Sequence, residues 1–168
     1  MTTPAAPKVF RLSRESEVNG AVSAWSFSVR TTNYLQDGDR IAVKLPYPAF
    51  LSETSACFGE SSNLRSEQPC TVSTDLTHVT ITLSLPSRRR ELSGDDFVLE
   101  EHRRLARSRT IASGEEFKFR VTRVKNPFSL RPTSQSIQYE VYTADLAKIE
   151  QVLDGYPVTN TEPGPLIP

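Results

Sequence analysis

The sequence predicts an all-β protein, an antiparallel β-sandwich of about seven to nine short strands with at most one or two short helices. Two observations support this prediction. Apolar and polar residues alternate over much of the chain, which is the period of a strand with one buried face. Turn-forming residues, chiefly glycine and proline, separate the alternating segments.

Five segments carry the clearest alternation, and each is expected to form a strand. In chain order they are 25–29, 41–45, 79–85, 117–121 and 137–141. The segment 79–85 has the most regular pattern, and Pro86 ends it. Weaker strands are expected at 9–12, 71–73, 97–99 and 149–153.

Two segments could contain a short helix. The stretch 100–107 is rich in Glu, Arg and Leu, and the stretch 143–153 places apolar residues at helical spacing. For the second stretch, a strand with one turn of helix is an equal alternative.

Length indicates one domain, and charge bears on the class of its partners. The chain has 168 residues, and its 20 Lys and Arg balance 20 Asp and Glu. This length is sufficient for one hydrophobic core, and the neutral balance argues against a dedicated nucleic-acid-binding protein. The ends at 1–8 and 157–168 are expected to be extended tails or linkers around a β-sandwich domain at 9–156.

No apolar run in the sequence is long enough to cross a membrane, and the first residues lack the apolar core of a signal peptide. The chain is therefore expected either to stay inside the cell or to be a segment of a longer protein.

The two cysteines, Cys57 and Cys70, flank a polar, loop-like segment. This arrangement predicts a disulfide, which the loop-closure model values at about 3 kcal/mol. Two free thiols are the alternative. A zinc site is disfavoured because the sequence has no CxxC pair and only two histidines, His78 and His102. A disulfide would indicate an oxidising compartment.

Glycine followed by an acidic residue precedes three of the expected strands, at 37–43, 93–99 and 113–119. We interpret these segments as turns, in which glycine supplies a positive φ and the acid stays solvated. No cofactor is expected. The alternative is calcium, because tight turns carry four candidate ligands: Asp37, Asp39, Asp95 and Asp96.

An arginine-rich segment contains Arg103, Arg104, Arg107 and Arg109 with no acidic residue between them. Its functional interpretation is capture of a polyanion or an acidic partner. The structural interpretation is a solvated edge whose charges deter edge-to-edge pairing of sheets.

Aromatic residues fall into two groups. Trp25, Phe27, Phe117, Phe119 and Tyr139 lie on alternating apolar faces and are expected in the core. Tyr34, Tyr47, Phe50 and Phe58 lie in expected loops or strand ends, where exposed rings would suit contact with a sugar or a peptide.

The sequence does not predict an enzyme. Neither histidine lies beside a nucleophile motif, and GxSxG, HExxH, P-loop and GxGxxG patterns are missing. Adjacent acids such as Asp95 and Asp96 would point to opposite faces of a strand and could not form a carboxylate pair.

A series of features along residues 25–145 has a familiar order. The features are Gly38-Asp39 leading to Leu45-Pro46, then Cys57 and Cys70, the strand at 79–85, Gly114 leading to the strand at 117–124, the segment 126–133, and a strand with Tyr139. This order resembles immunoglobulin-like β-sandwich modules of large surface and adhesin-type proteins of single-celled eukaryotes and microbes.

The resemblance implies a spacer, a binding surface or a polymerising unit, and it carries over no catalytic residue. The chain departs from the immunoglobulin pattern because its cysteines flank a loop, where that fold places them on facing sheets with a tryptophan between them.

These features favour a non-catalytic structural or adhesive module of an extracellular or cell-surface assembly. Its expected partners are other protein modules, including neighbouring copies, with a glycan as a further option and nucleic acid disfavoured. The alternative is an intracellular β-sandwich module with reduced cysteines, which docks an acidic partner through the arginine-rich segment.

Overall fold

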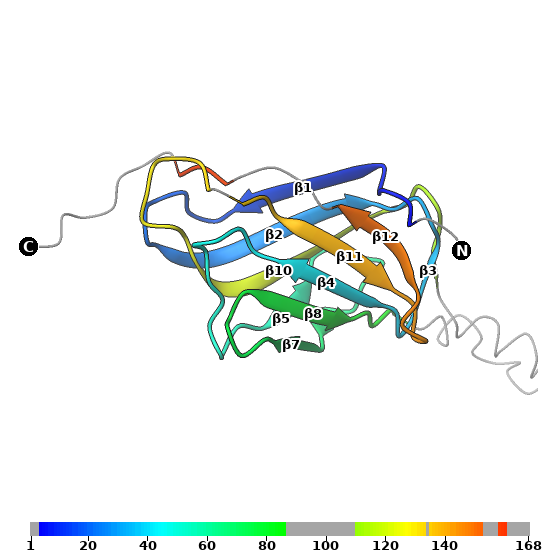
Figure 1. The fold of residues 1–168 in the computed structure, drawn as a ribbon. Coiled ribbons are helices and arrows are strands. Elements are labelled where there is room, and N and C mark those ends of the chain that lie inside the picture. Colours follow the sequence, from blue (N-terminus) through cyan, green and yellow to red (C-terminus); the bar gives the residue numbers. More distant parts are fainter. Residues whose placement is uncertain (1–3, 87–109, 134, 153–157, 161–168) are drawn as a thin grey trace, which may run out of the picture.

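A computed structural model describes residues 4–86, 110–133, 135–152 and 158–160. These residues form two antiparallel five-stranded sheets, packed face to face, and a small two-stranded sheet (Figure 1). They include no helix. The prediction of an antiparallel all-β sandwich is therefore confirmed.

The first sheet has the strand order β1-β2-β10-β5-β6. Its strands are β1 (Val9–Arg14), β2 (Val22–Arg30), β10 (Glu116–Lys125), β5 (Cys57–Gly59) and β6 (Glu67–Gln68). β2 and β10 are the two longest strands and pair with each other over most of their length.

The second sheet has the order β12-β11-β4-β8-β7. Its strands are β12 (Lys148–Val152), β11 (Gln138–Tyr142), β4 (Arg40–Lys44), β8 (His78–Thr82) and β7 (Cys70–Val72). The small sheet pairs β3 (Leu35–Gln36) with β9 (Thr110–Ile111).

Alternation places the core between the two large sheets. Along β2, Trp25, Phe27 and Val29 are buried while the intervening residues face outward. Phe27 packs against Phe119 of β10, with ring centroids 5.1 Å apart. The same alternation buries Ile41, Val43, Val79, Ile81, Phe117, Val121, Tyr139 and Val141. The inward faces expected for the five clearest strands are thus confirmed.

The segment expected to be helical, 143–153, contains a tight turn followed by β12. The Thr143 amide donates to the Ala147 carbonyl at 2.8 Å, and Leu146 adopts a φ of 67°. β12 then pairs with β11, so the helix option for this segment is wrong. The expected helix at 100–107 and strand at 97–99 lie outside the described residues.

A polar network closes the end of the sandwich where β2 begins and β10 ends. Asn126 lies at its centre: its Oδ1 accepts the buried Trp25 indole N–H at 3.2 Å, and its Nδ2 donates to the carbonyls of Ser16 and Val18. The side-chain Nδ2 of Asn160 donates to the Pro127 and Ser129 carbonyls. Residues 158–160, within the expected tail, therefore contact the sandwich.

The N-terminal segment contacts the second sheet before the chain enters the first. Ala5 forms a parallel bridge with Glu150 of β12, in which the Ala5 amide donates to the Ile149 carbonyl and the Gln151 amide donates to the Ala5 carbonyl. At this point in the expected tail 1–8, the chain occupies the outer edge of β12.

Candidate functional site

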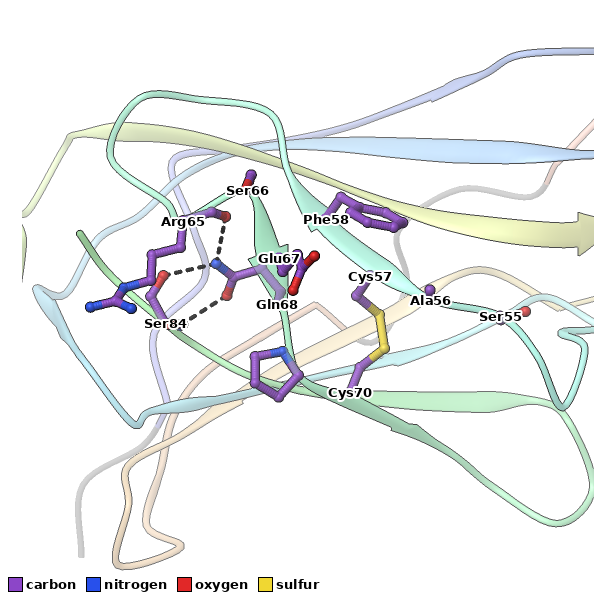
Figure 2. Close-up of a pocket in the computed structure, with 11 residues that line it drawn as sticks. Ser55, Ala56, Cys57, Phe58, Arg65, Ser66, Glu67, Gln68, Cys70 and Ser84 are labelled. Carbon is purple, nitrogen blue, oxygen red and sulfur yellow. Dashed lines mark hydrogen bonds between the residues drawn. A yellow bond between two sulfur atoms is a disulfide. The ribbon is translucent and has the colours of Figure 1, made fainter.

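One long edge of the sandwich is closed by the Cys57–Cys70 disulfide. Cys57 belongs to β5 of the first sheet and Cys70 to β7 of the second, and their Cα atoms are 6.1 Å apart (Figure 2). The expected disulfide is present. The expectation that the cysteines only flank a loop is wrong, because β6 lies between them and the bridge joins the facing sheets.

Gln68 makes a second connection at the same edge. From β6 it donates through Nε2 to the carbonyls of Arg65 and Ser84 and accepts the Ser84 amide on Oε1, at distances of 2.8 to 2.9 Å (Figure 2). The side-chain amide thus pairs with the main chain that leaves β8, as a neighbouring strand would. Gln68 is only 4% exposed, and these bonds are partly buried at the edge.

A shallow groove of about 630 Å³ runs along this edge, between β5, β6 and β7. The disulfide and the polar segment 65–69, which includes β6, line it. Arg65, the cation in this lining, donates through Nε to the Leu85 carbonyl at 3.1 Å. The groove carries no cluster of His, Cys, Asp or Glu that suits a metal, within the part of the chain that the structure describes.

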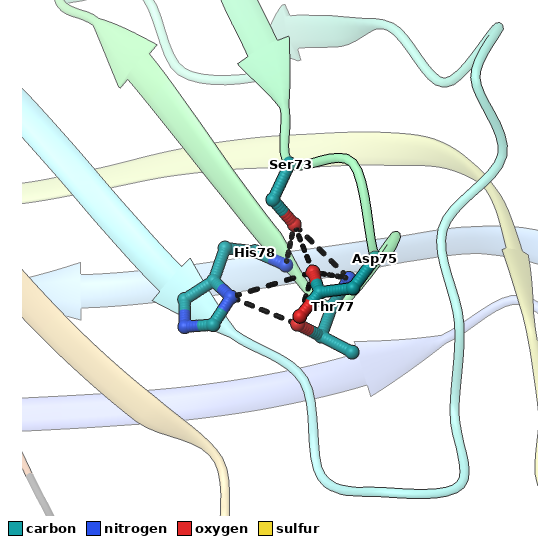
Figure 3. Close-up of polar contacts among 4 residues, drawn as sticks. All are labelled: Ser73, Asp75, Thr77 and His78. Carbon is teal, nitrogen blue, oxygen red and sulfur yellow. Dashed lines mark hydrogen bonds and ion pairs between the residues drawn. The ribbon is translucent and has the colours of Figure 1, made fainter.

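The turn between β7 and β8 gathers the residue types of a hydrolase: Ser73, Asp75, Thr77 and His78 (Figure 3). Ser73 Oγ donates to Asp75 Oδ1 at 2.6 Å, and the backbone N–H of His78 donates to Ser73 Oγ at 3.0 Å. Among the residues that the structure describes, the imidazole Nδ1 contacts the Thr77 hydroxyl, at 2.8 Å, and Asp75, at 4.0 Å. A serine nucleophile must donate its proton to the imidazole, which this geometry does not provide.

The four side chains stabilise the turn itself. Hydrogen bonds from the Ser73 and Thr77 hydroxyls lower the pKa of Asp75 to about 2. Both hydroxyls donate to the Asp75 carboxylate, two residues away, and Ser73 Oγ also accepts the backbone N–H of His78, five residues away. These short-range bonds are the local pattern of Asx and ST turns. His102, the other histidine considered for catalysis, lies outside the described residues.

The aspartates considered for calcium are capping groups where the structure describes them. Asp37 Oδ1 accepts the Leu85 amide and Asp39 Oδ2 accepts the Gln36 amide, each at 2.8 Å. Asp39 is 6% exposed, and burial raises its pKa. Asp95 and Asp96 lie outside the described residues.

Exposed apolar side chains gather at the end where β2 begins. Tyr47, Phe128 and Val22 are 55%, 64% and 61% exposed. Tyr47 meets Phe50 edge to face at 5.9 Å, and Phe50 forms a backbone bridge with Lys125. The Lys125 ammonium lies 4.5 Å from the centre of the Phe128 ring. We call Val22, Tyr47, Phe50, Lys125 and Phe128 together the aromatic end.

Sequence reasoning found only part of the aromatic end. The sequence predicts an exposed contact for Tyr47 and Phe50. Phe128 lies in a proline-flanked segment, where no sequence pattern indicates an exposed ring. Tyr34, a further candidate, is 58% exposed at the opposite end of the sandwich. Phe58 lies on β5 beneath the Arg120 guanidinium, 5.0 Å from the ring centre.

The arginines considered for a polyanion, Arg103, Arg104, Arg107 and Arg109, also lie outside the described residues. Within the described ranges, no helix has the length and apolar character that crossing a membrane requires.

Comparison with known proteins gives similarities to solved structures. No known family matches the sequence, and no curated protein matches it. BslA, a bacterial hydrophobin, is 14% identical with a TM-score of 0.43, over 92% of this chain and 96% of BslA. A family GH18 chitinase from Chromobacterium violaceum is 10% identical with a TM-score of 0.41, over 89% of this chain and 19% of the chitinase.

A third similarity is to BcpA, the major pilin subunit of Bacillus cereus. It is 8% identical with a TM-score of 0.37, over 90% of this chain and 40% of the BcpA chain.

Proposed function

We propose that the protein is a non-catalytic structural or adhesive module of an extracellular or cell-surface assembly. The observation that carries this proposal is the disulfide between the two sheets. Disulfides persist in oxidising compartments and are rare in the reducing cytosol. A sandwich whose open edge is closed by such a bridge suits a module that works outside the cell.

The polar clusters of the described residues support a non-catalytic role. The hydroxyl, carboxylate and imidazole groups of residues 73–78 bond to one another and to their own turn. Asp37 and Asp39 cap backbone amides. These groups thus stabilise the connections between strands, and none is placed to activate a nucleophile.

The aromatic end supports contact with other molecules. Exposed, contiguous apolar patches commonly mark interaction sites on soluble proteins. Tyrosine and phenylalanine supply a large contact area with few rotatable bonds, so little conformational entropy is lost on binding. The partners that fit this surface are other protein modules, including neighbouring copies of the same chain.

Counting the free thiols of the protein in its natural cells tests whether it resides in an oxidising compartment. Cells are lysed into denaturant that contains an alkylating reagent, and the intact mass is measured before and after reduction. We expect no alkyl groups before reduction and two after it. Cys57→Ser serves as the control, because its remaining Cys70 should take up one alkyl group without reduction and so verify that the reagent reacts.

Two alkyl groups before reduction would contradict the proposal. That outcome would favour an intracellular module with reduced cysteines, which docks an acidic partner through its arginine-rich segment.

A further inference from the structure

We infer that the outer face of the first sheet is a binding site for a carboxylate-bearing polysaccharide, which lies in a groove along β2. This inference rests on the proposed adhesive function and names the class of ligand. The groove adjoins the aromatic end at Val22, and it shares no described lining residue with the groove at the disulfide edge.

Small side chains form the floor of the groove. Between the exposed ends of β2, Val22 and Arg30, the outward-facing positions are Ala24, Ser26 and Ser28, because the alternate residues are buried in the core. They extend the floor over about 13 Å of strand. The strand β2 lies between β1 and β10, so longer side chains on both neighbours stand beside this floor.

The register fixes which side chains flank each serine. Ser28 lies opposite Arg11 of β1 and Lys118 of β10. Ser26 lies opposite Ser13 of β1 and Arg120 of β10. Each serine is thus paired across the sheet with at least one long cationic side chain, which can close over a ligand lying on the hydroxyl.

Two hollows lie along this face. One of about 510 Å³ is lined by Arg11, Ser13, Ser26, Ser28 and Lys118, among others. The other, of about 330 Å³, includes Ala24 and Arg120 in its lining. Both hollows are open to solvent, which suits an extended chain lying across the surface more than an enclosed small molecule.

The groove offers hydrogen-bonding groups that the fold does not use. Among the described residues, the hydroxyls of Ser13, Ser26 and Ser28 have no hydrogen-bond partner, and Arg11 and Arg120 have no acidic partner. Lys118, by contrast, is 3.8 Å from Glu116. A hydroxyl can donate and accept, and a guanidinium binds a carboxylate through two parallel hydrogen bonds.

Charge selects among anionic polymers. Four cations line the two hollows, Arg11, Lys118, Arg120 and Arg123, together with three acids, Glu15, Glu60 and Glu116. A chain of uronic acid units, with one carboxylate per sugar, suits this small positive excess, and its free hydroxyls can donate to the acids. A densely sulfated chain carries several charges per sugar and would meet repulsion from the same three carboxylates at more positions than a uronic acid chain does.

The sheet geometry disfavours two other classes of polymer. β2 is hydrogen-bonded to β1 and β10 along both edges, so this floor cannot accept an additional peptide strand. Single-stranded nucleic acid binds through aromatic stacking, but the ring on this face, Phe58, lies beneath Arg120.

Titration calorimetry with oligogalacturonate on the purified full-length chain tests the inference. We expect the double substitution Arg11→Ala with Arg120→Ala to weaken binding at least tenfold. Arg40→Ala with Lys44→Ala is the matched control, since it removes the same charge from β4 of the second sheet and should change affinity less than twofold. Binding should weaken from 20 to 150 mM salt as the ionic contacts are screened. Thermal melts verify that both variants fold.

Several outcomes would overturn the inference: no binding of oligogalacturonate, an equal loss in both double variants, or poly-glutamate or dextran sulfate binding more tightly with the same sensitivity to the Arg11 and Arg120 substitutions. Binding that survives these substitutions but is lost when Arg103, Arg104, Arg107 and Arg109 become alanine would move the site to the arginine-rich segment. The thiol measurement is independent of all these outcomes, so failure here leaves the proposed compartment standing.

Discussion

Glu150 is a carboxylate buried in the sandwich, with 0% of its surface exposed. It accepts the Thr31 hydroxyl at 2.5 Å and the Thr32 amide at 2.8 Å, and it thereby joins β12 of the second sheet to the chain that leaves β2. Burial raises its pKa above the ordinary 4.5, although these hydrogen bonds oppose that rise. The sequence could not predict this contact, because the partners are 118 and 119 residues away from Glu150.

Glu150→Gln should reduce the dependence of stability on pH. Between pH 4.5 and the raised pKa of the folded state, the folded protein holds a proton that the unfolded chain has released. The free energy of unfolding therefore falls as pH rises through this window, and it is higher at lower pH. Urea unfolding at several values from pH 4.5 to 7.5 should show this slope in the parent protein and a smaller one in the variant. Glu67→Gln, at an exposed position, should keep the parent slope.

The two-residue strand β6 lies where the chain passes from the first sheet to the second. β6 is too short to show any alternation in the sequence, yet it sets the position of Gln68 and directs the chain through Pro69 into β7. The five clearest strands could be predicted because each buries every second side chain. The sheet change at 68–70 could not be, since no periodicity marks it. For this reason the cysteine pair was predictable but the sheets that it joins were not.

Gln68→Ala should destabilise the edge by about 1–3 kcal/mol, because the Ser84 amide and carbonyl lose their partner in a partly buried site. Glu67→Ala, one residue away and exposed, should change stability by less than about 0.5 kcal/mol. Urea unfolding of the oxidised protein measures both. Equal effects of the two substitutions would show that the side-chain amide is not what holds this edge.

At the scale of the whole molecule, exposed hydrophobic residues are more numerous at one end of the sandwich than at the other. Of the exposed large hydrophobic residues that the structure describes, Val22, Tyr47, Phe128 and Leu130 lie at the end where β2 begins. The sequence marked some of these residues as loop aromatics. It could not show that they form one surface, because the Phe50 bridge to Lys125 joins segments 75 residues apart.

Tyr47→Ser combined with Phe128→Ser should weaken adsorption to a hydrophobic surface. The reason is that the pair removes two highly exposed rings from one contiguous patch. Retention on a phenyl resin in ammonium sulfate measures the effect. The control, Tyr34→Ser with Leu146→Ser, removes comparably exposed side chains from the opposite end and should shorten retention less. An equal shift for both pairs would contradict a specialised aromatic end.

The first described residues lie beside β12, and residues 158–160 lie beside the end of β10, at opposite ends of the sandwich (Figure 1). Tension applied between these two segments would run along the strand axes. The disulfide spans a sequence separation of 13 residues, so about 45 Å of contour between Cys57 and Cys70 would stay locked under load. The bridge thus limits how far the module can lengthen when it is pulled.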